Sequence, residues 1–378
     1  MKKVVMLADY HHEIPPIKGA AVETWMNEVS KKIISYEMHI ISISHPFLPL
    51  KEFKDGIYYH RIFFSKVYKR IFQKILGWDV LSYQKRVINI IKEINPDIVH
   101  IHNFRKSEEI VRELKKFNKN IQIILHMHNE NEYFKKHKYP KIDVFVACSN
   151  HLMNFYEKII DSNIKKVIYN GVDYNKFNLD EDTKKSINLS MKTNNNEINI
   201  CYFGRISPEK GVDKFIELAI LLKNEKKYNF FAFGEISRKG DRKKYYDNLL
   251  NIIKKENLNL KINNYITSSK MYLAYQYADI VIVPSKFEEP FGMVALEALA
   301  AGKIVIAVRK GGMIEFLNDK NSYIINDYNN FSVKAQELIQ NIDLNNKSII
   351  NNAKITAHKF DWINIAIKTE RLYNEISN

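Results

Sequence analysis

Short apolar runs alternate with amphipathic stretches along almost the whole chain. In its first half the pattern predicts strands at 3–8, 38–43, 97–101, 121–126, 143–147 and 166–169, and helices at 20–35, 81–94, 107–117 and 150–160. Strands that are apolar on both faces need cover on both faces, so this alternation favours a parallel sheet between two layers of helices. The first half is therefore expected to be a doubly wound α/β domain.

The alternation pauses in a polar stretch, Asp180 to Asn196, which follows the Asn-Gly turn signal at 170–171. A second series then predicts strands at 198–204, 229–233, 279–283, 304–308 and 322–325, and helices at 211–223, 241–256, 268–277, 293–301 and 330–341. The tail, 350–377, reads as helices. We place the boundary between two α/β domains after residue 175, so that the first domain is 1–175.

Composition fits two ordinary domains in a reducing compartment. The chain has 378 residues, 46% of them hydrophobic, and two cysteines, too few for a disulfide framework. No apolar run approaches the roughly 18 residues of a membrane-spanning helix, and the basic start at Met1 leads into a strand rather than a secretory segment. We expect a cytoplasmic protein, soluble or peripheral.

The net charge of +15 points to an anionic partner. No aromatic and basic nucleic-acid motif accompanies it, so an anionic membrane surface or an anionic acceptor is the better expectation. The segment 66–78 mixes Lys and Arg with Phe, Ile, Leu and Trp. It fits a helix lying peripherally at the inner membrane face. It equally fits a helix docked on its own domain with a solvated basic face.

One stretch, 287–302, carries most of the chemistry. The apolar run 280–283 predicts a buried strand before it, and Pro290 and Gly292 force a tight turn into a helix that starts near Met293. Backbone N–H groups at the positive end of that helix would bind phosphate or sugar oxygens.

Two carboxylates flank this anion site, Glu289 on the turn and Glu297 about one turn into the helix. They are costly there unless each accepts hydrogen bonds from hydroxyl groups. A nucleotide-sugar offers that pattern, with sugar hydroxyls, two phosphates and ribose hydroxyls in succession.

The Glu-x7-Glu motif from Glu289 to Glu297 resembles the retaining glycosyltransferases of family 4, which have the GT-B fold. The resemblance covers nearly the whole chain and is closest to the spore-coat protein SA-like, cell-envelope polysaccharide branch. It implies two Rossmann-like domains facing a cleft, with the acceptor on 1–175 and the nucleotide-sugar on 176–358. It also implies a final helix, 359–378, that packs back on the N-terminal domain and is marked by the aromatic residues at 360–362.

The resemblance also assigns residue roles. The four residues that it places at the reacting centre are His128, Arg205, Lys210 and Glu289. The set that it places on the donor is Gly19, Ala20, Gly204, Arg205, Lys210, Ile262, Glu289, Phe291, Gly292, Met293, Val294 and Glu297. Arg205 has a planar guanidinium group that can donate two parallel hydrogen bonds, and Lys210 has a compact ammonium group. Together these cations suit a diphosphate leaving group.

Several segments bear on these roles. The family usually has two adjacent glycines in the first loop, where this chain has Gly19 and Ala20, and alanine disfavours a positive φ. Gly311-Gly312 with Glu315 looks like a further turn near the donor. Of the neighbouring histidines, His126 is expected in the core and His102 at the acceptor cleft.

Other cofactor and metal classes lack support. The chain contains no Gly-x-Gly-x-x-Gly and no Walker loop. Asp180-Glu181-Asp182 has an Asp-x-Asp form but lies in the polar linker, and no His or Cys cluster has metal-ligand spacing. We therefore expect no cofactor and no metal. The co-substrate is a nucleotide-sugar, most simply a UDP-sugar, although 262–266 lacks the family's glycine and leaves GDP- and ADP-sugars open.

The expected reaction is metal-independent transfer of a sugar, with retained configuration, to a glycan, lipid-linked or cell-envelope acceptor. Two alternatives remain open at this point. A catalytically idle scaffold or spore-coat protein would keep the fold and lose the site, and a GT-B sugar-nucleotide epimerase would share the architecture. The sugar, the acceptor, the linkage and the oligomeric state are not specified by these residues.

Overall fold

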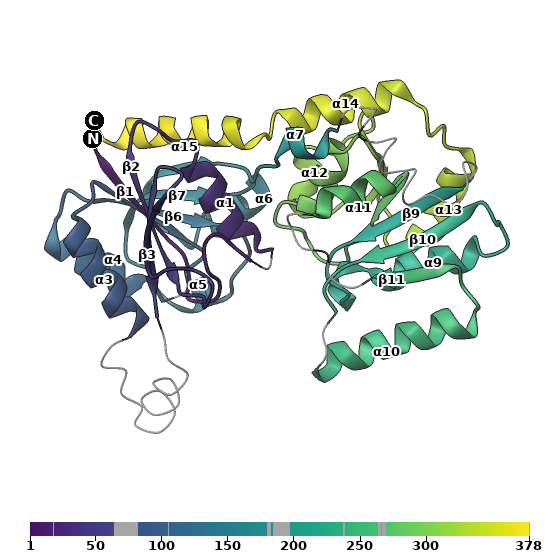
Figure 1. Cartoon of the computed structure of the whole chain (residues 1–378), viewed down its shortest axis with the longest axis horizontal. Helices are drawn as coiled ribbons and strands as arrows, with labels where there is room; N and C mark the ends of the chain where they lie inside the picture. Colours follow the sequence, from purple (N-terminus) through teal and green to yellow (C-terminus); the bar gives the residue numbers. More distant parts are fainter. Residues whose placement is uncertain are drawn as a thin grey trace. The chain divides into compact units, whose positions relative to one another are not determined.

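The computed structural model describes residues 1–17, 19–63, 82–104, 106–179, 183, 197–236, 239–263, 266 and 270–377. The chain forms two compact units (Figure 1). The N-terminal unit contains Met1–Gly171 together with Trp362–Asn378, and the C-terminal unit contains Val172–Asp361. The predicted boundaries are 175/176, from the residue pattern, and 358/359, from the family resemblance. The basic segment 66–78 and the acidic triplet 180–182 lie outside the described residues.

The N-terminal unit is built on a sheet that has eight strands among the described residues. All neighbouring strands are parallel except the edge pair β3 and β4. In sheet order the strands are β3 (Lys51–Lys54), β4 (Ile57–Ile62), β2 (Glu37–Ile43), β1 (Lys3–Leu7), β5 (Ile98–His102), β6 (Gln122–Met127), β7 (Ile142–Ala147) and β8 (Ser162–Val167).

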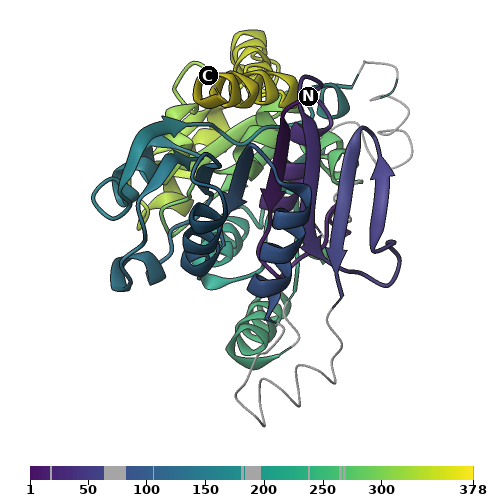
Figure 2. The ribbon, with the colours of Figure 1, turned by 90° about the vertical axis from the view of Figure 1, so that its left-hand side faces the viewer.

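Helices cover both faces of this sheet. Helix α1 (Ala21–Ser30) and the returning helix α15 (Trp362–Ser377) share one core with β1, whereas α3 (Tyr83–Ile94) and α4 (Glu108–Phe117) pack on each other across the other face (Figure 2). The described residues of this unit also form two short helices, α5 (Tyr133–Lys136) and α6 (Asn150–Tyr156). Local chemistry sets the ends. The hydroxyl of Ser82 accepts from the Lys85 N–H at the start of α3, and Asn95 ends it in the left-handed region.

The residue pattern missed the edge strand β3 and its neighbour β4. Strand β3, Lys-Glu-Phe-Lys, is mostly exposed, and an edge strand of such composition carries no apolar run for a pattern to detect. Strand β4 has the alternation of a strand with one buried face, but its tyrosines, His60 and Arg61 mask that signal.

The C-terminal unit has a six-stranded sheet among its described residues, and every neighbouring pair is parallel. In sheet order the strands are β11 (Leu260–Asn263), β10 (Tyr228–Phe233), β9 (Ile198–Phe203), β12 (Ile280–Val283), β13 (Ile304–Val308) and β14 (Tyr323–Ile325). Strand β12 is buried at every position, as a strand covered on both faces must be.

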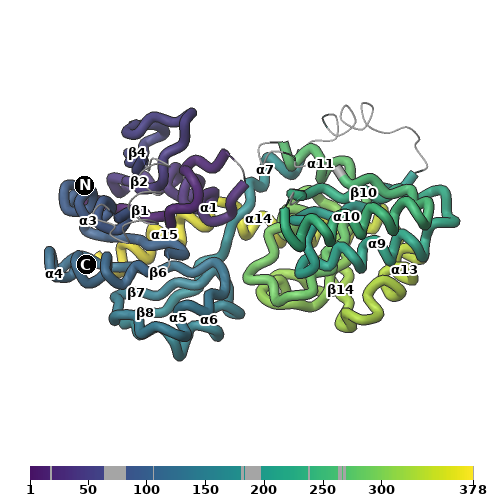
Figure 3. The backbone as a smooth tube through the Cα atoms, turned by 90° about the horizontal axis from the view of Figure 1, so that it is seen from below, coloured from purple at the N-terminus to yellow at the C-terminus, as the bar shows by residue number. Residues whose placement is uncertain are grey.

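Helices again cover both faces. One layer consists of α9 (Val212–Leu221), α10 (Gly240–Lys255) and α13 (Phe331–Asn341), which lie beside one another in Figure 3. The other layer consists of α7 (Tyr174–Phe177), α11 (Met271–Tyr277), α12 (Met293–Ala300) and α14 (Lys347–His358). Two 3₁₀ helices, η2 (Pro208–Lys210) and η3 (Gly311–Glu315), follow β9 and β13. Both units are therefore the doubly wound α/β folds that the residue pattern predicts.

Each sheet has a point at which the chain reverses the direction of its winding. In the N-terminal unit β1 separates β2 from β5, and in the C-terminal unit β9 separates β10 from β12. In open α/β sheets, ligands bind at the carboxyl ends of the strands at such a switch point. The fold therefore directs attention to the loops that follow β9 and β12.

Helix α15 returns the end of the chain to the N-terminal unit. Trp362 and Tyr373 belong to that unit's core, and the Trp362 ring lies directly against the backbone of Gly171. A Cβ atom on Gly171 would overlap this ring, so the glycine permits the contact. Within the described part of the chain, no helix combines the length and apolar character needed to span a bilayer.

Candidate functional site

The loop after β9 packs tightly against the end of β12. Gly204 and Gly211 both have positive φ values, 127° and 71°, which glycine adopts without strain. A Cβ atom on Gly211 would overlap the backbone oxygen of Pro284, the residue that follows β12. Glycine at 211 thus allows the two loops to touch, and Lys210, directly before it, is carried to the switch point.

Lys210 and Glu289 form an ion pair across these two loops. The Lys210 Nζ atom lies 2.8 Å from Oε1 of Glu289, and both side chains are mostly buried. The Ser285 hydroxyl donates to the same Oε1 atom at 2.6 Å, and the Lys210 ammonium lies 4.6 Å from the centre of the Phe287 ring. Within the described part of the chain both hydrogen bonds reach Oε1, which leaves Oε2 to accept from a ligand hydroxyl.

Backbone hydrogen bonds join the loops after β9, β12 and β13. The carbonyl oxygen of Glu209 accepts from the N–H of Lys286 at 3.0 Å, and that of Glu289 accepts from the N–H of Gly312 at 2.7 Å. The Gly311 N–H donates to Oε2 of Glu288 at 2.5 Å. The predicted Gly-Gly turn at 311–312 therefore fixes the backbone that carries Glu289.

The turn into α12 has the predicted form. Gly292 caps the helix with a φ of 98°, and a Cβ atom there would overlap the Met313 side chain. Phe291 points into the core, where its ring lies 5.1 Å from that of Phe316. The N–H groups of Met293 and Val294 belong to the first turn, which has no intrahelical acceptors for them. This helix end can therefore bind an anion.

Glu297 lies in α12 and presents a carboxyl group that protein atoms surround, although the residue keeps part of its surface exposed. Burial raises the pKa of this carboxyl to about 7, and the Tyr275 hydroxyl and Lys176 partly oppose the rise. The group therefore changes charge near neutral pH. A carboxyl in this state gains from a ligand that donates hydroxyl hydrogen bonds to its ionised form.

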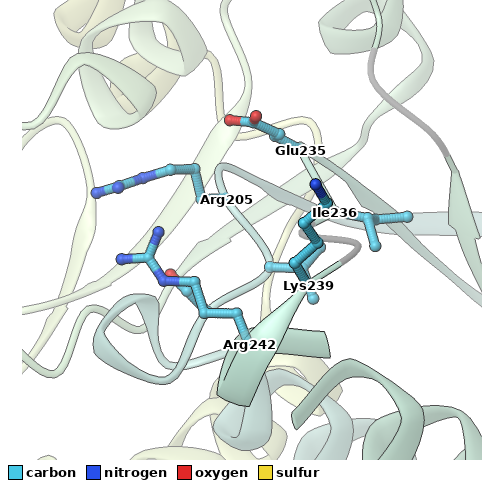
Figure 4. A pocket seen from close by; sticks show the side chains of 7 residues that line it. Arg205, Glu235, Ile236, Lys239 and Arg242 are labelled. Atoms are coloured by element: carbon cyan, nitrogen blue, oxygen red, sulfur yellow. The ribbon is translucent and has the colours of Figure 1, made fainter. Parts of the chain in front are cut away.

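Arg205 lies at the rim of the site rather than in the Lys210–Glu289 pair. Its side chain is half exposed, and both Arg205 and Arg242 approach Oε1 of Glu209, at 3.9 and 3.3 Å. The two guanidinium groups run side by side along a pocket of about 310 Å³ that Glu235 and Lys239 also line (Figure 4). Arg205 thus presents a cation to this pocket.

Ile262 lies in β11, two strands away from β9, paired with Ala232 of β10. The predicted donor residues 204, 205, 210, 289, 291–294 and 297 all belong to the loops and helix that begin at the ends of β9 and β12. Ile262 shares their sheet edge but is not in their immediate group.

Gly19 and Ala20 belong to the N-terminal unit, in the loop between β1 and α1. Ala20 caps α1 with a φ of −140°, which is ordinary extended backbone. The loop therefore needs no second glycine, and alanine in place of the family's usual residue causes no backbone strain.

His128, also in the N-terminal unit, follows β6 and is 7% exposed. Its Nε2 atom lies 3.1 Å from Nδ1 of His102, and its Nδ1 atom lies 3.0 Å from Oδ1 of Asn170. Burial lowers the pKa of His128 to about 4, so its imidazole is neutral at pH 7. Both ring nitrogens are thus engaged within the unit, and its role toward the sugar stays a prediction.

The two other histidine expectations have different outcomes. His126 is fully buried, as predicted. His102 is fully buried as well, so the expectation that it lines an acceptor surface is wrong. The apolar neighbours of β5 predict a buried strand, and the alternating side chains of His100 and His102 both face the helix layer that covers it.

Four residues of the site were given no role in the sequence analysis. Ser285 and Phe287 hold the Lys210–Glu289 pair, and Glu209 and Arg242 accompany Arg205. Ser285 follows a buried strand within four residues of Glu289, which is a usable signal. Arg242 is distant in sequence and lies on α10, so only the packing of α10 near the β9 loop reveals it.

Comparison with protein families gives two matches that together cover most of the chain. The family model described as Glycosyltransferase Family 4 matches residues 35–176, and the model described as Glycosyl transferases group 1 matches residues 184–355. The second match contains Arg205, Lys210, Glu289 and Glu297.

Several curated proteins are similar over nearly their full length. The lipopolysaccharide 1,2-N-acetylglucosaminetransferase of Salmonella typhimurium is 32% identical over 98% of this chain and 97% of its own. Spore coat protein SA of Bacillus subtilis is 22% identical over 89% of each chain.

Solved structures share the fold. Sucrose-phosphate synthase from Thermosynechococcus elongatus aligns with a TM-score of 0.80 at 15% identity, covering 99% of both chains. Anabaena Alr3699/HepE, solved in complex with UDP and glucose, aligns with a TM-score of 0.76 at 17% identity, covering 99% of this chain and 100% of its own. The predicted GT-B fold is confirmed by these similarities.

Proposed function

Because this chain belongs to the glycosyltransferases, with a family 4 domain followed by a group 1 domain, we propose that it moves a sugar from a UDP-sugar to a cell-envelope glycan, with retention of configuration. The GT-B fold and the transferase class are premises here. The donor, the acceptor class and the stereochemistry are the proposal.

The observation that carries the proposal is the Lys210–Glu289 pair at the switch point of the C-terminal sheet. A lysine ammonium has three N–H groups, so Lys210 can keep Glu289 and still donate to a diphosphate oxygen. Glu289 has a second carboxylate oxygen for a sugar hydroxyl. One buried pair can thereby hold both parts of a nucleotide-sugar.

The hard step in glycosyl transfer is departure of the nucleoside diphosphate, because negative charge grows on the bridging phosphate oxygen. Lys210, Arg205 and the first N–H groups of α12 are the cationic and dipolar groups that this unit offers. Groups fixed in place before the reaction stabilise charge as it develops, without reorganisation in the transition state. We assign the leaving-group stabilisation to these groups.

Glu289 and His128 have positioning roles in this proposal rather than nucleophilic ones. The Oε1 atom of Glu289 already accepts from Lys210 and Ser285, which weakens it as a nucleophile. In a same-face displacement the leaving phosphate would take the proton of the acceptor hydroxyl, so no enzyme nucleophile is needed. Glu297 is assigned to the ribose hydroxyls.

Two relatives support the choice of donor and acceptor. The Salmonella typhimurium protein is an N-acetylglucosaminetransferase that acts on lipopolysaccharide, and HepE was solved with UDP and with UDP-glucose. UDP-N-acetylglucosamine and UDP-glucose are therefore the first donors to try. An excess of cationic residues, +15 overall, agrees with a phosphorylated or otherwise anionic acceptor.

The test is incubation of the full chain with a panel of UDP-, GDP- and ADP-sugars, with and without lipopolysaccharide core oligosaccharides. Release of UDP together with a glycosylated product whose anomeric proton shows the donor's configuration supports the proposal. Release of another nucleoside diphosphate would overturn the choice of donor, and inverted product would overturn retention. Conversion between epimeric donors without transfer would favour an epimerase, and absence of any donor binding would favour a scaffold.

Metal independence is tested in the same assay. Arg205 and Lys210 supply the positive charge that a divalent ion supplies to the diphosphate in other transferases. We therefore expect no gain from added Mg²⁺ or Mn²⁺ and no immediate loss with a chelator. A requirement for either ion would remove this part of the proposal.

A further inference from the structure

Four histidines gather inside the N-terminal unit, where the neighbouring strands β5 and β6 each carry a His-x-His sequence. We call His100, His102, His126 and His128 the histidine cluster. The strand register pairs His102 with His126, so the alternating side chains of both strands face the same helix layer. The first three members are fully buried.

The cluster is closed by aromatic side chains from both covering helices. The Trp25 ring of α1 lies 4.9 to 5.8 Å from all four imidazole rings, centre to centre, and Tyr373 of α15 lies 5.8 Å from His100. Trp25 uses its own N–H elsewhere, donating to the carbonyl oxygen of Tyr169 at 3.2 Å. Apolar residues of the unit's core surround the group. Bulk water is therefore excluded.

Hydrogen-bond roles inside the cluster follow from Asn170. Its Oδ1 atom can only accept, so the Nδ1 atom of His128 donates and Nε2 of the same neutral ring must accept. The partner of that Nε2 atom is Nδ1 of His102, at 3.1 Å, which therefore donates. The Nε2 atom of His102 consequently carries no hydrogen and has a lone pair available.

Several buried nitrogens of the cluster lack hydrogen bonds to any described residue. They are Nε2 of His100, Nε2 of His102 and both ring nitrogens of His126. The backbone of Ile168 raises the pKa of His126 against the larger lowering effect of burial, but no hydrogen bond of ordinary geometry accompanies this. Each unsatisfied buried polar atom costs about 1–3 kcal/mol, so a binding partner is expected here.

The geometry of these atoms favours a cation over a water molecule. One nitrogen from each of His100, His102 and His126 lies within 4.8 Å of the other two. A neutral imidazole has one nitrogen without a hydrogen, and three such nitrogens exceed the two hydrogens that one water molecule can donate. A metal ion accepts all three, and nitrogen donors suit Zn²⁺.

We propose that His100, His102 and His126 bind a Zn²⁺ ion inside the N-terminal unit. The second nitrogen of two ligands is already held, by Tyr373 Oη at 2.8 Å for His100 and by His128 for His102, and such outer hydrogen bonds are typical of zinc-bound histidines. Ligation at roughly 2.0–2.1 Å would require the three rings to rotate so that their nitrogens come closer together. Water takes the fourth tetrahedral position.

A zinc ion at this site would link β5 to β6 next to His128. Zinc would fix His102, and His102 in turn holds His128 through one hydrogen bond. The spacing of the histidines in the sequence does not reveal this site, because two ligands come from one strand and one from the next. It is separate from the predicted donor residues, which all belong to the other unit except Gly19 and Ala20.

The direct test uses the full chain without an affinity tag, produced in zinc-supplemented medium and dialysed. Elemental analysis is expected to find about one zinc per chain. X-ray absorption is expected to show nitrogen donors at roughly 2.0–2.1 Å. Refolding with Co²⁺ alone is expected to give the visible absorption of a tetrahedral cobalt site.

Variants locate the site. His126→Gln and His102→Gln should lose the metal, and Tyr373→Phe should weaken binding by about 10- to 100-fold through the lost outer hydrogen bond. His60→Gln is the matched control, a half-buried histidine of the same sheet that pairs with His39. Loss of metal in the His60 variant with retention in the His126 variant would overturn the assignment.

Wild-type protein settles the question if the variants do not fold. A chain that remains metal-free after refolding with stoichiometric Zn²⁺ or Co²⁺ would contain buried water only, and the proposal would fail. Zinc with sulfur donors, or with fewer than three nitrogen donors, in the absorption spectrum would also refute it.

Discussion

The ammonium group of Lys210 and the carboxylate of Glu289 are separated by 79 residues in sequence, and their nearest atoms lie 2.8 Å apart. The pair connects the ends of β9 and β12, the strands that flank the switch point of the C-terminal sheet. Each charge makes burial of the other tolerable. The chemistry proposed for this unit depends on that contact.

Replacing Lys210 with alanine should lower turnover by about 10²-fold or more, because a charge that stabilises the leaving diphosphate is lost. The rate of UDP release at saturating donor measures the effect. Lys286→Ala is the matched control, since Lys286 is exposed in the adjoining loop and should leave turnover unchanged. Normal turnover in a folded Lys210→Ala protein would remove Lys210 from the proposed mechanism.

Replacing Gly311 with alanine should displace Glu289. Gly311 has a φ of 54°, and a Cβ atom there would overlap the backbone of Glu289. Gly240→Ala is the control, because Gly240 also has positive φ, 64°, but open space around it. The control should cost about 1–2 kcal/mol of unfolding free energy. Gly311→Ala should cost about 1–3 kcal/mol more and weaken donor binding. Equal costs in urea unfolding would show that the contact is unimportant.

Stability should depend on pH through Glu297. Its pKa is about 7 in the folded protein against an ordinary 4.5, so the folded state holds a proton that the unfolded chain releases. The contribution of this group to stability is therefore present below pH 4.5 and is lost as pH rises to 7. Glu297→Gln should abolish this slope and be the more stable protein above pH 7. Glu337→Gln, at an exposed position of α13, should retain it.

Nucleotide binding should show the opposite trend if Glu297 accepts from ribose hydroxyls. The ionised fraction of a group with a pKa of about 7 rises by about tenfold between pH 6 and 8, and affinity for UDP should follow it. The diphosphate also titrates in this range, so calorimetry on Glu297→Gln isolates the contribution of the side chain. An identical pH profile in that variant would contradict the ribose assignment.

Replacing Gly171 with alanine should loosen the return of α15 to the N-terminal unit. The new methyl group would overlap the Trp362 ring, and we expect a loss of about 1–3 kcal/mol of unfolding free energy. Trp362→Ala removes the obstacle, so the double variant should be less destabilised than the sum of the two single variants. Strict additivity in denaturant unfolding would show that this steric contact does not limit the packing.

Much of the fold follows from local pattern. Buried parallel strands such as 280–283 need apolar residues at every position, and the helices between them need an apolar face. The order of strands and helices along the chain could therefore be predicted from sequence. The edge strand β3 was not predicted, because an exposed edge has no such requirement, and its neighbour β4 was not, because its polar residues mask the alternation. The turn at 290–293 could be predicted for another reason. Proline restricts the backbone dihedral angles and glycine widens their range, whatever the surrounding structure.

The site divides in the same way. Arg205, Lys210, Glu289 and Glu297 could be chosen from sequence because their loops follow buried strands and resemble a known motif. Their partners could not, because Ser285, Glu209 and Arg242 differ from other polar residues only in what the fold puts beside them. Nor could His102 be placed correctly, because the local sequence around a histidine at a strand end is the same whether its side chain faces solvent or a covering helix.

By itself, the order of apolar and polar residues determined two doubly wound domains and the strand ends that carry chemistry, because hydrophobic burial acts on local periodicity. Only the tertiary structure decided which charges pair, that both nitrogens of His128 are engaged, and that ring nitrogens of three histidines lie within 4.8 Å of one another. Those outcomes depend on strand register and helix packing between residues far apart in the chain, and no local pattern encodes such distances.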